Sequence, residues 1–380
     1  MKFLDQLQAL DRRYIYIVVA LAIIIPLLVP YNSDVITTPP TENLYQLIDS
    51  YSGRSDRAIL ISFYHDASTM PELYPMELAI LRHCFERKIK VFTLTFIPAG
   101  APIIDFALNT VKEEYPNIQS GVDYCNFGYK IMPMIVALGM GDNIATTIDT
   151  DAEGRKLANL PIMKNIVNYN EMNLIIETSG SVAGGTWITY ARSKFGANVA
   201  VGVTAVMAAD EYPYLQSGQL IGMLTGLKGA AEYEKLVDVF AAYRDDNFPQ
   251  GRPFSKEILR DPSIKKLINI TTQTQAVFSP EEYKSFVAKY PQQAPYLDKL
   301  KQQKDGNIVF DVTKITPADQ KLLGPQLYTA LNKQTHNILY KFKTARIGMN
   351  AQSIAHIMIL VFIVIGNIGY FTSRTKNKKA

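Results

Sequence analysis

Apolar runs alternate with amphipathic segments through the middle of the chain. Runs rich in β-branched and aromatic residues, typical of buried strands, occupy residues 57–65, 90–97, 122–129, 173–178 and 198–207. Helical patterns lie between them, at residues 75–88, 102–116, 162–170 and 187–196, and a helical or mixed segment begins at 133–140. Strands that alternate with helices form parallel sheets covered on both faces. The pattern therefore predicts an α/β fold, with a five-stranded, doubly wound (Rossmann-like) parallel sheet over residues 55–243.

A row of small residues follows the last predicted strand. Gly218, Gly222, Gly226 and Ala230 recur at every fourth position within residues 214–236. On an α-helix this spacing places all four along one face. Glycine destabilises a helix interior by about 1 kcal/mol, so we expect this face to be approached closely, as a helix-packing or oligomer contact. Another helix of the domain, a second copy of the chain and a ligand all remain open as the neighbour.

Two longer apolar runs flank the predicted domain. Residues 14–30 and 354–371 each predict a transmembrane helix, the first an uncleaved anchor because no A-x-A cleavage pattern follows it. Lys2, Arg12 and Arg13 precede the first run, and the basic tail 372–380 follows the second. The positive-inside rule then places both residues 1–13 and the tail in the cytoplasm. We therefore expect a two-pass protein of the cell membrane whose main domain is extracytoplasmic.

Two further segments connect these elements. Residues 31–54 form a polar linker that includes a short amphipathic helical pattern, TENLYQLIDSY. Residues 244–344 are rich in Lys, Gln, Asp and Pro and show short helical patterns such as SPEEYKSFVAKY. Because strand–helix alternation does not continue there, we expect a helical insertion or subdomain between the sheet and the second membrane helix.

Composition narrows the classes of partner and cofactor. The net charge of +4 arises from 39 basic and 35 acidic residues without a long basic run, which argues against nucleic acid. Cys84 and Cys125 have no CxxC spacing, and the four histidines do not gather, so neither a metal nor another cofactor is predicted. The two cysteines are consistent with one disulfide or, preferably, with two buried thiols. The lipid bilayer is the partner that the sequence supports best.

Candidate binding residues follow the carboxyl ends of the predicted strands. In doubly wound sheets, ligands bind outside these ends, where the strand order reverses. We therefore expect a ligand-binding rim made of small and polar residues from four different loops. Its members are Asp66, Ser68, Thr69, Gly128, Tyr129, Lys130, Ser179, Ser181 and Asp210. In particular, Asp66, Ser68, Lys130 and Ser179 are expected to surround one pocket.

Three sharper interpretations of the rim have simpler alternatives. The segment DASTM is similar to the D-x-S-x-S metal-adhesion motif of von Willebrand A domains, but Met70 replaces its second serine. A strand-end residue or a helix cap is the simpler reading of Asp66. The segment TSGSVAGG would let backbone amides cradle an anion, although a capping turn also explains it. His65 with a rim serine would suit a hydrolase, but no third group is evident to orient it, and no catalytic residue is assigned.

These observations leave three functions open. The first is a non-catalytic scaffold, a membrane-anchored component that assembles with itself as a homo-oligomer or with other envelope proteins. The second is a sensor or binding component that holds a small ligand at the strand-end rim. The third is a hydrolase that uses His65. The absence of a catalytic signature favours the first two.

Overall fold

The computed structural model describes residues 12–29, 31, 33–115, 117–181, 183–241, 251–261, 275–304, 306–335 and 344–377. The chain divides into two units, which are described separately. Residues 35–345 form the larger unit. The terminal segments, residues 1–34 and 346–380, form the other.

A parallel sheet organises the larger unit. Its strands are β1 (Ala58–Tyr64), β2 (Lys90–Thr95), β3 (Tyr124–Tyr129), β4 (Leu174–Ser179), β5 (Asn198–Val203) and β6 (Gly222–Thr225). The strands pair in the order β3-β2-β1-β4-β5-β6, and every pair is parallel. This is the order of doubly wound sheets, which reverses between β1 and β4. The predicted α/β fold is confirmed, whereas the predicted count of five strands is wrong, because the sheet has six.

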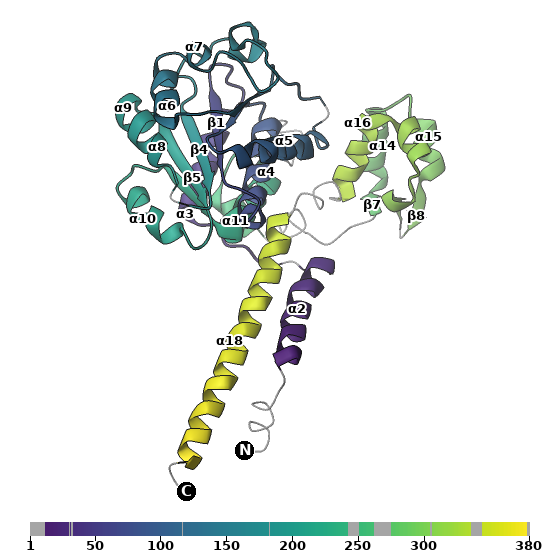
Figure 1. Cartoon of the computed structure of the whole chain (residues 1–380). Coiled ribbons are helices and arrows are strands. Elements are labelled where there is room, and N and C mark those ends of the chain that lie inside the picture. The colour runs from purple at the N-terminus through teal and green to yellow at the C-terminus, as the bar shows by residue number, and fades with distance from the viewer. Residues whose placement is uncertain are drawn as a thin grey trace. The chain divides into compact units, whose positions relative to one another are not determined.

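Helices cover both faces of this sheet (Figure 1). One face carries α3 (Pro39–Asp49), α4 (Met70–Glu86), α5 (Ala101–Lys112) and α11 (Gly226–Leu236). The other carries α6 (Pro133–Asp142), α7 (Ile144–Ile148), α8 (Gly185–Trp187), α9 (Ser193–Phe195) and α10 (Ala208–Gln216). Shorter elements are the 3₁₀ turns Pro98–Gly100, Leu157–Asn159 and Pro161–Met163, the π-helical turns Ile188–Arg192 and Val237–Ala241, and α12 (Lys256–Arg260). Because the strands are buried on both faces, their sequences are almost continuously apolar.

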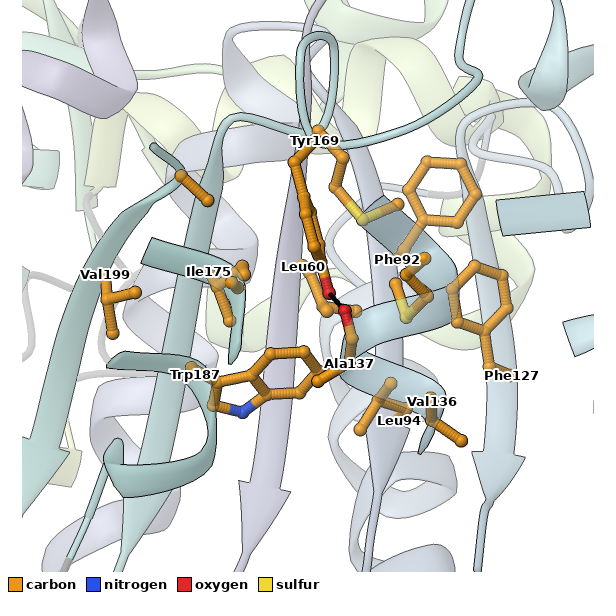
Figure 2. Packing of buried hydrophobic residues seen from close by; sticks show 14 of the residues in the cluster. Leu60, Phe92, Leu94, Phe127, Val136, Ala137, Tyr169, Ile175, Trp187 and Val199 are labelled. Carbon is orange, nitrogen blue, oxygen red and sulfur yellow. Dashed lines mark hydrogen bonds between the residues drawn. The ribbon is translucent and has the colours of Figure 1, made fainter. Parts of the chain in front are cut away.

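Figure 2 shows the core on the second face. Leu60, Phe92 and Ile175 project from three adjacent strands toward the indole of Trp187 and the ring of Tyr169. The Tyr169 hydroxyl donates a hydrogen bond to the Ala137 carbonyl of α6 (2.7 Å), so this buried phenol has a partner. Cys84 and Cys125 are buried free thiols, and burial raises the pKa of both. The preferred sequence reading of two buried thiols is confirmed.

The predicted glycine-row helix is wrong. Gly218 follows α10 in a left-handed conformation (φ 72°), Gly222 begins strand β6, and Gly226 and Ala230 lie on α11. Residues 219–225 are a short apolar run, for which four-residue spacing does not separate strand from helix. Close approach does occur at Gly222, where an added Cβ would lie 2.8 Å from Leu44 Cβ of α3. That neighbour belongs to the same chain.

The helix expected at residues 162–170 is also absent. Only the 3₁₀ turn Pro161–Met163 forms, and the chain then bends with Asn165 at φ 67°. Asn168 accepts a hydrogen bond from the Asn170 amide (2.9 Å), and Glu171 accepts from the amides of Val167 and Asn168. Side chains that take up backbone amides in this way compete with helix formation.

The segment expected to be a helical insertion, 244–344, contains a sheet as well. Its described elements are β7 (Gln275–Phe278), α14 (Pro280–Ala288), α15 (Ala294–Leu300), β8 (Gln302–Lys304), β9 (Asn307–Asp311), the 3₁₀ turn Val312–Lys314 and α16 (Pro317–Thr335), which is interrupted at Gly324. The strands pair antiparallel in the order β7-β9-β8. Phe278, Phe310 and Leu323 belong to their shared core. Strands of three to five residues give too short a pattern to be distinguished in sequence.

The terminal unit contains two apolar helices, α2 (Arg12–Leu28) and α18 (Thr344–Asn377). Among the described residues, one stretch is long and apolar enough to cross a membrane, Thr344–Ile368; the apolar part of α2, Arg13–Leu28, is shorter. The structure thus supports one of the two predicted spans. Asn350 of α18 joins the terminal segments: it accepts a hydrogen bond from the Ser33 hydroxyl and donates one to the Tyr31 carbonyl. Lys2 and residues 378–380 lie outside the described residues.

Candidate binding site at the strand ends

The loop after β1 is shaped by Asp66. Its Oδ1 accepts hydrogen bonds from the amide (2.8 Å) and the hydroxyl (2.6 Å) of Ser68, which closes a tight turn ahead of α4. These hydrogen bonds lower the pKa of Asp66, so the carboxylate is ionised at neutral pH. Both bonds go to one oxygen and the side chain is exposed, so Oδ2 is accessible to solvent. Asp66 therefore closes a turn that ends at Ser68, one residue before Thr69, the N-cap of α4, and it does not cap the helix itself.

The connection from β2 to α5 forms the facing wall. The Thr95 hydroxyl accepts from the Ile97 amide (3.1 Å) and also lies within hydrogen-bonding distance of the Ile97 carbonyl (3.0 Å), which bends the chain at the end of the strand. Gly100 then passes so close to the sheet that an added Cβ would lie 2.3 Å from Thr95 Oγ1 and 2.7 Å from the Phe63 carbonyl oxygen. This close passage brings the first two turns of α5 beside the loop after β1.

An open hollow of about 570 Å³ lies between these two segments. It is lined by Asp66, Ala67, Ser68, Met70, Ala99, Pro102, Ile103 and Phe106. Its volume lies in the range of small-molecule sites, and one carboxylate among apolar groups is a common composition for such sites. Phe106 is 55% exposed, and its ring stacks on Tyr74 with centroids 5.1 Å apart. We call this feature the β1–β2 hollow.

The loop after β4 differs because its amides already have partners. The Gly184 amide donates to Glu177 Oε1 (2.7 Å), the Ala183 amide to Glu211 Oε1 (2.9 Å), and the Ser181 amide to the Ser179 hydroxyl (3.1 Å). Burial raises the pKa of Glu177 to about 7 and also raises that of Glu211. An anion at this loop would have to displace two carboxylates of the protein itself. In the anion cradle suggested by TSGSVAGG, the amides of Ala183 and Gly184 are therefore already bonded to carboxylates of the same chain.

Glu177 also fixes the loop to its surroundings. Its Oε2 accepts from the Trp187 indole (2.8 Å) and the Ser62 hydroxyl of β1 (3.1 Å). The two nitrogen donors, Gly184 N–H and Trp187 Nε1–H, cannot act as acceptors, so each needs an oxygen facing it. A carboxylate supplies both oxygens, whereas an amide would supply one.

The crevice at the reversal of strand order is closed by direct contact. An added Cβ on Gly180 would lie 2.5 Å from Thr69 Cγ2, so the loops after β1 and β4 touch there. Ser179 is fully buried beneath this contact. Small size at position 180 therefore permits the loops to close, and the β1–β2 hollow lies one strand away from the expected crevice.

His65 is committed to neighbours on both sides of its ring. Its Nε2 lies 2.6 Å from Glu77 Oε1 of α4, and its Nδ1 lies 3.0 Å from the Asp66 carbonyl oxygen. Burial lowers the pKa of His65, but the hydrogen bond and charge of Glu77 outweigh this effect, so the pKa is raised. Neither ring nitrogen is free for a serine. The Ser179 hydroxyl instead contacts Ser181, so the geometry gives the hydrolase hypothesis no support.

The other predicted rim residues lie outside the β1–β2 hollow. Gly128 and Tyr129 end β3, two strands from β1, and Lys130 donates to the Thr150 carbonyl (3.3 Å). Asp210 lies in the first turn of α10, beyond β5. The hollow thus includes Asp66 and Ser68 of the predicted set; Thr69 and Ser179 lie at and beneath the contact between the loops after β1 and β4.

An exposed apolar stretch follows β3, and the sequence analysis missed it. Its large side chains are between 43% and 63% exposed: Tyr129, Ile131, Met132, Met134 and Ile135. Met132 adopts a left-handed backbone conformation (φ 56°) at the start of α6, which is uncommon for a residue with a side chain. The run at 133–140 was predicted as the start of a helical or mixed segment without a statement of its exposure, and apolar composition alone gives no sign of exposure. We call this stretch the β3 apolar patch.

The buried glutamates were missed as well. Glu77 and Glu177 sit inside apolar runs, MELAILRH and NLIIET, where a lone carboxylate is the signal that was available. Glu77 Oε1 also accepts from the Thr178 hydroxyl (2.6 Å), so one carboxylate holds His65 after β1 and Thr178 of β4 together. In the part of the chain that the structure describes, no three His, Cys, Asp or Glu side chains are placed to hold a metal ion.

Comparison with known proteins finds no matching family model, no similar curated protein and no similar solved structure.

Proposed function

We propose that the chain is a non-catalytic, membrane-tethered binding protein that holds a small ligand in the β1–β2 hollow. The observation that carries the proposal is the hollow itself, which lies at the carboxyl ends of adjacent parallel strands. It is lined by apolar side chains, Ser68 and one ionised carboxylate. Phe106 supports it, because this residue lines the hollow and its ring, 55% exposed, is available for contact with a ligand.

Filling the hollow tests this proposal. Ala99 is exposed and lines the hollow, so Ala99→Trp should occupy the space without disturbing the core. Ala209 is exposed on α10 outside the hollow, so Ala209→Trp is a matched control. Saturation-transfer NMR of the detergent-solubilised chain with a mixture of small apolar fragments should show signals that Ala99→Trp abolishes and Ala209→Trp retains. Equal fragment binding by both variants would contradict a ligand site in the hollow.

We also propose that residues 14–30 and 354–371 both cross the membrane, with both termini in the cytoplasm and the α/β domain outside. Basic residues precede the first apolar run and follow the second, at the ends that face the chain termini, and they favour this arrangement. The bonds from Asn350 to the chain at Tyr31 and Ser33 also favour it, because a hairpin brings these two segments to the same side.

Cysteine labelling tests the topology. The two native thiols are buried, which keeps the background low. An impermeant maleimide added to intact cells should label Lys301→Cys and should leave Lys378→Cys unlabelled until the membrane is permeabilised. Labelling of Lys378→Cys in intact cells would exclude the proposed hairpin.

A second candidate function is assembly with itself or with other envelope proteins through the β3 apolar patch. The observation in its favour is that five large apolar side chains lie exposed within seven residues. The double variant Ile131→Lys/Ile135→Lys should then reduce the sedimentation coefficient of the detergent-solubilised chain. Val206→Lys, at an apolar residue that is 84% exposed elsewhere, is the control. An unchanged assembly state in the double variant would remove this candidate.

A further inference from the structure

We infer that the β1–β2 hollow selects a cationic ligand, an organic ammonium group attached to an apolar body. The inference rests on the proposed function and adds the chemical class of the ligand. Asp66 is the one charged side chain among the described residues that line the hollow. Its exposed oxygen therefore sets the sign of charge that the hollow accepts.

The hydrogen bonds of Asp66 explain why a neutral ligand is disfavoured. The Ser68 amide and hydroxyl stabilise the ionised form of Asp66. A neutral ligand that covers this carboxylate removes water from a charge and supplies no counter-charge. An ammonium group replaces the lost water with a charge-assisted hydrogen bond.

The surrounding loops explain why an anion is disfavoured. The amide of Ser68, which lines the hollow, already donates to Asp66. The turn from β1 into α4 contains no glycine that would let the backbone approach a phosphate group. An anion in the hollow would be repelled by the Asp66 carboxylate and would find the Ser68 amide occupied.

The aromatic and apolar walls define the rest of the ligand. Tyr74 stacks on Phe106 at an interplanar angle of 16°, which covers one face of the Phe106 ring. Phe106 also lines the hollow, where a ring can attract a cation through its π-face. Met70, Pro102 and Ile103 complete an apolar wall suited to a hydrocarbon body.

The test uses three probes of similar shape and different charge: 2-phenylethylammonium, 2-phenylethanol and phenylacetate. The reporter is the ¹³C-methyl signal of Met70, which lines the hollow, in the full chain held in a nonionic detergent. This signal is assigned by its loss in Met70→Leu. Because the reporter is local, partition of the probes into micelles does not imitate binding.

We expect 2-phenylethylammonium to bind about tenfold more tightly than 2-phenylethanol, from one exposed ion pair and one cation–π contact. Asp66→Asn keeps an oxygen for the Ser68 turn and removes the charge, so it should bring the two affinities together. Asp56→Asn is the matched control, because Asp56 precedes β1 at the opposite end of the strand. It should leave the preference unchanged.

Two failures are distinguishable. If the alcohol or phenylacetate binds as tightly as the ammonium, or if Asp66→Asn retains the preference, the cationic class is wrong and the ligand site stands. If none of the probes shifts the Met70 signal, both the class and the proposed ligand site are overturned.

Discussion

The loop after β4 and the connection that follows β2 lie at the same edge of one sheet, yet the first is closed by its own hydrogen bonds and the second borders an open hollow. After β4, three backbone amides meet side-chain oxygens, two of them from buried glutamates. After β2, the chain turns away at Gly100 and leaves a hollow beside the loop after β1. The difference teaches that polar, glycine-rich sequence at a strand end does not by itself indicate an open site. What decides is whether the chain supplies its own partners for those amides.

The largest effect expected from this contrast concerns two phenylalanines. Phe96 is 8% exposed and stacks on Trp187 in the core, whereas Phe106 is 55% exposed in the β1–β2 hollow. Phe96→Ala should lower the free energy of unfolding by about 3 to 5 kcal/mol. Phe106→Ala should lower it by less than about 1 kcal/mol, since the residue loses little buried area. Urea unfolding of the detergent-solubilised chain measures both, and equal losses would mean that the hollow is part of the core.

The next effect is the pH dependence that the closed loop confers. The pKa of Glu177 is about 7 in the folded chain, against 4.5 without burial. Between these values the folded chain retains a proton that the unfolded chain has lost, so the free energy of unfolding falls as pH rises. The fall amounts to about 3 kcal/mol in all.

Glu177→Gln serves to isolate this contribution, because it cannot titrate. Urea unfolding at a series of pH values from 4.5 to 8 should give a shallower slope for the variant than for the native chain. The raised pKa of His65 also makes stability fall with rising pH, through the folded pKa, and remains in both proteins. Identical slopes would show that Glu177 does not titrate in this range.

The smallest effect tests the contact that closes the crevice. An added Cβ on Gly180 would lie 2.5 Å from Thr69 Cγ2, whereas one on Gly185 would meet no atom within 4 Å. Gly180→Ala should therefore cost about 1 to 3 kcal/mol of stability, and Gly185→Ala should cost none. Thr69→Ser removes Cγ2, so the double variant Thr69→Ser/Gly180→Ala should recover part of the loss. Thermal unfolding that does not separate the two glycines would contradict a closed crevice.

Whether an element could be predicted from the sequence depended on the length and regularity of its pattern. The strands containing Ile59, Val91 and Ile175 form long apolar runs, and a parallel sheet was predictable from them. The four-residue strand beginning at Gly222 was predicted as helix because Gly222 shares a helical spacing with Gly218 and Gly226 on either side of the strand. Six strands instead of five, and a small sheet within 244–344, both follow from this weakness of short patterns.

The candidate site was predictable only in part, for a different reason. Asp66 and Ser68 were identified by their place after β1, which the fold class alone determines. The burial of Ser179 could not be predicted, because it depends on the packing of Gly180 against Thr69. These two loops are more than 100 positions apart in the sequence. The hollow itself depends on how Gly100 positions α5, and no local pattern encodes that geometry.

The Gly180–Thr69 contact has a mechanical consequence. Since no slack remains between the two loops, a displacement of Thr69 toward β4 is transmitted to Gly180 instead of being absorbed. Glu77 reinforces the link by holding His65 and Thr178 through one oxygen. The two halves of the sheet, which meet at β1 and β4, are therefore coupled at this edge. We expect a displacement of the end of one strand to displace the end of the other.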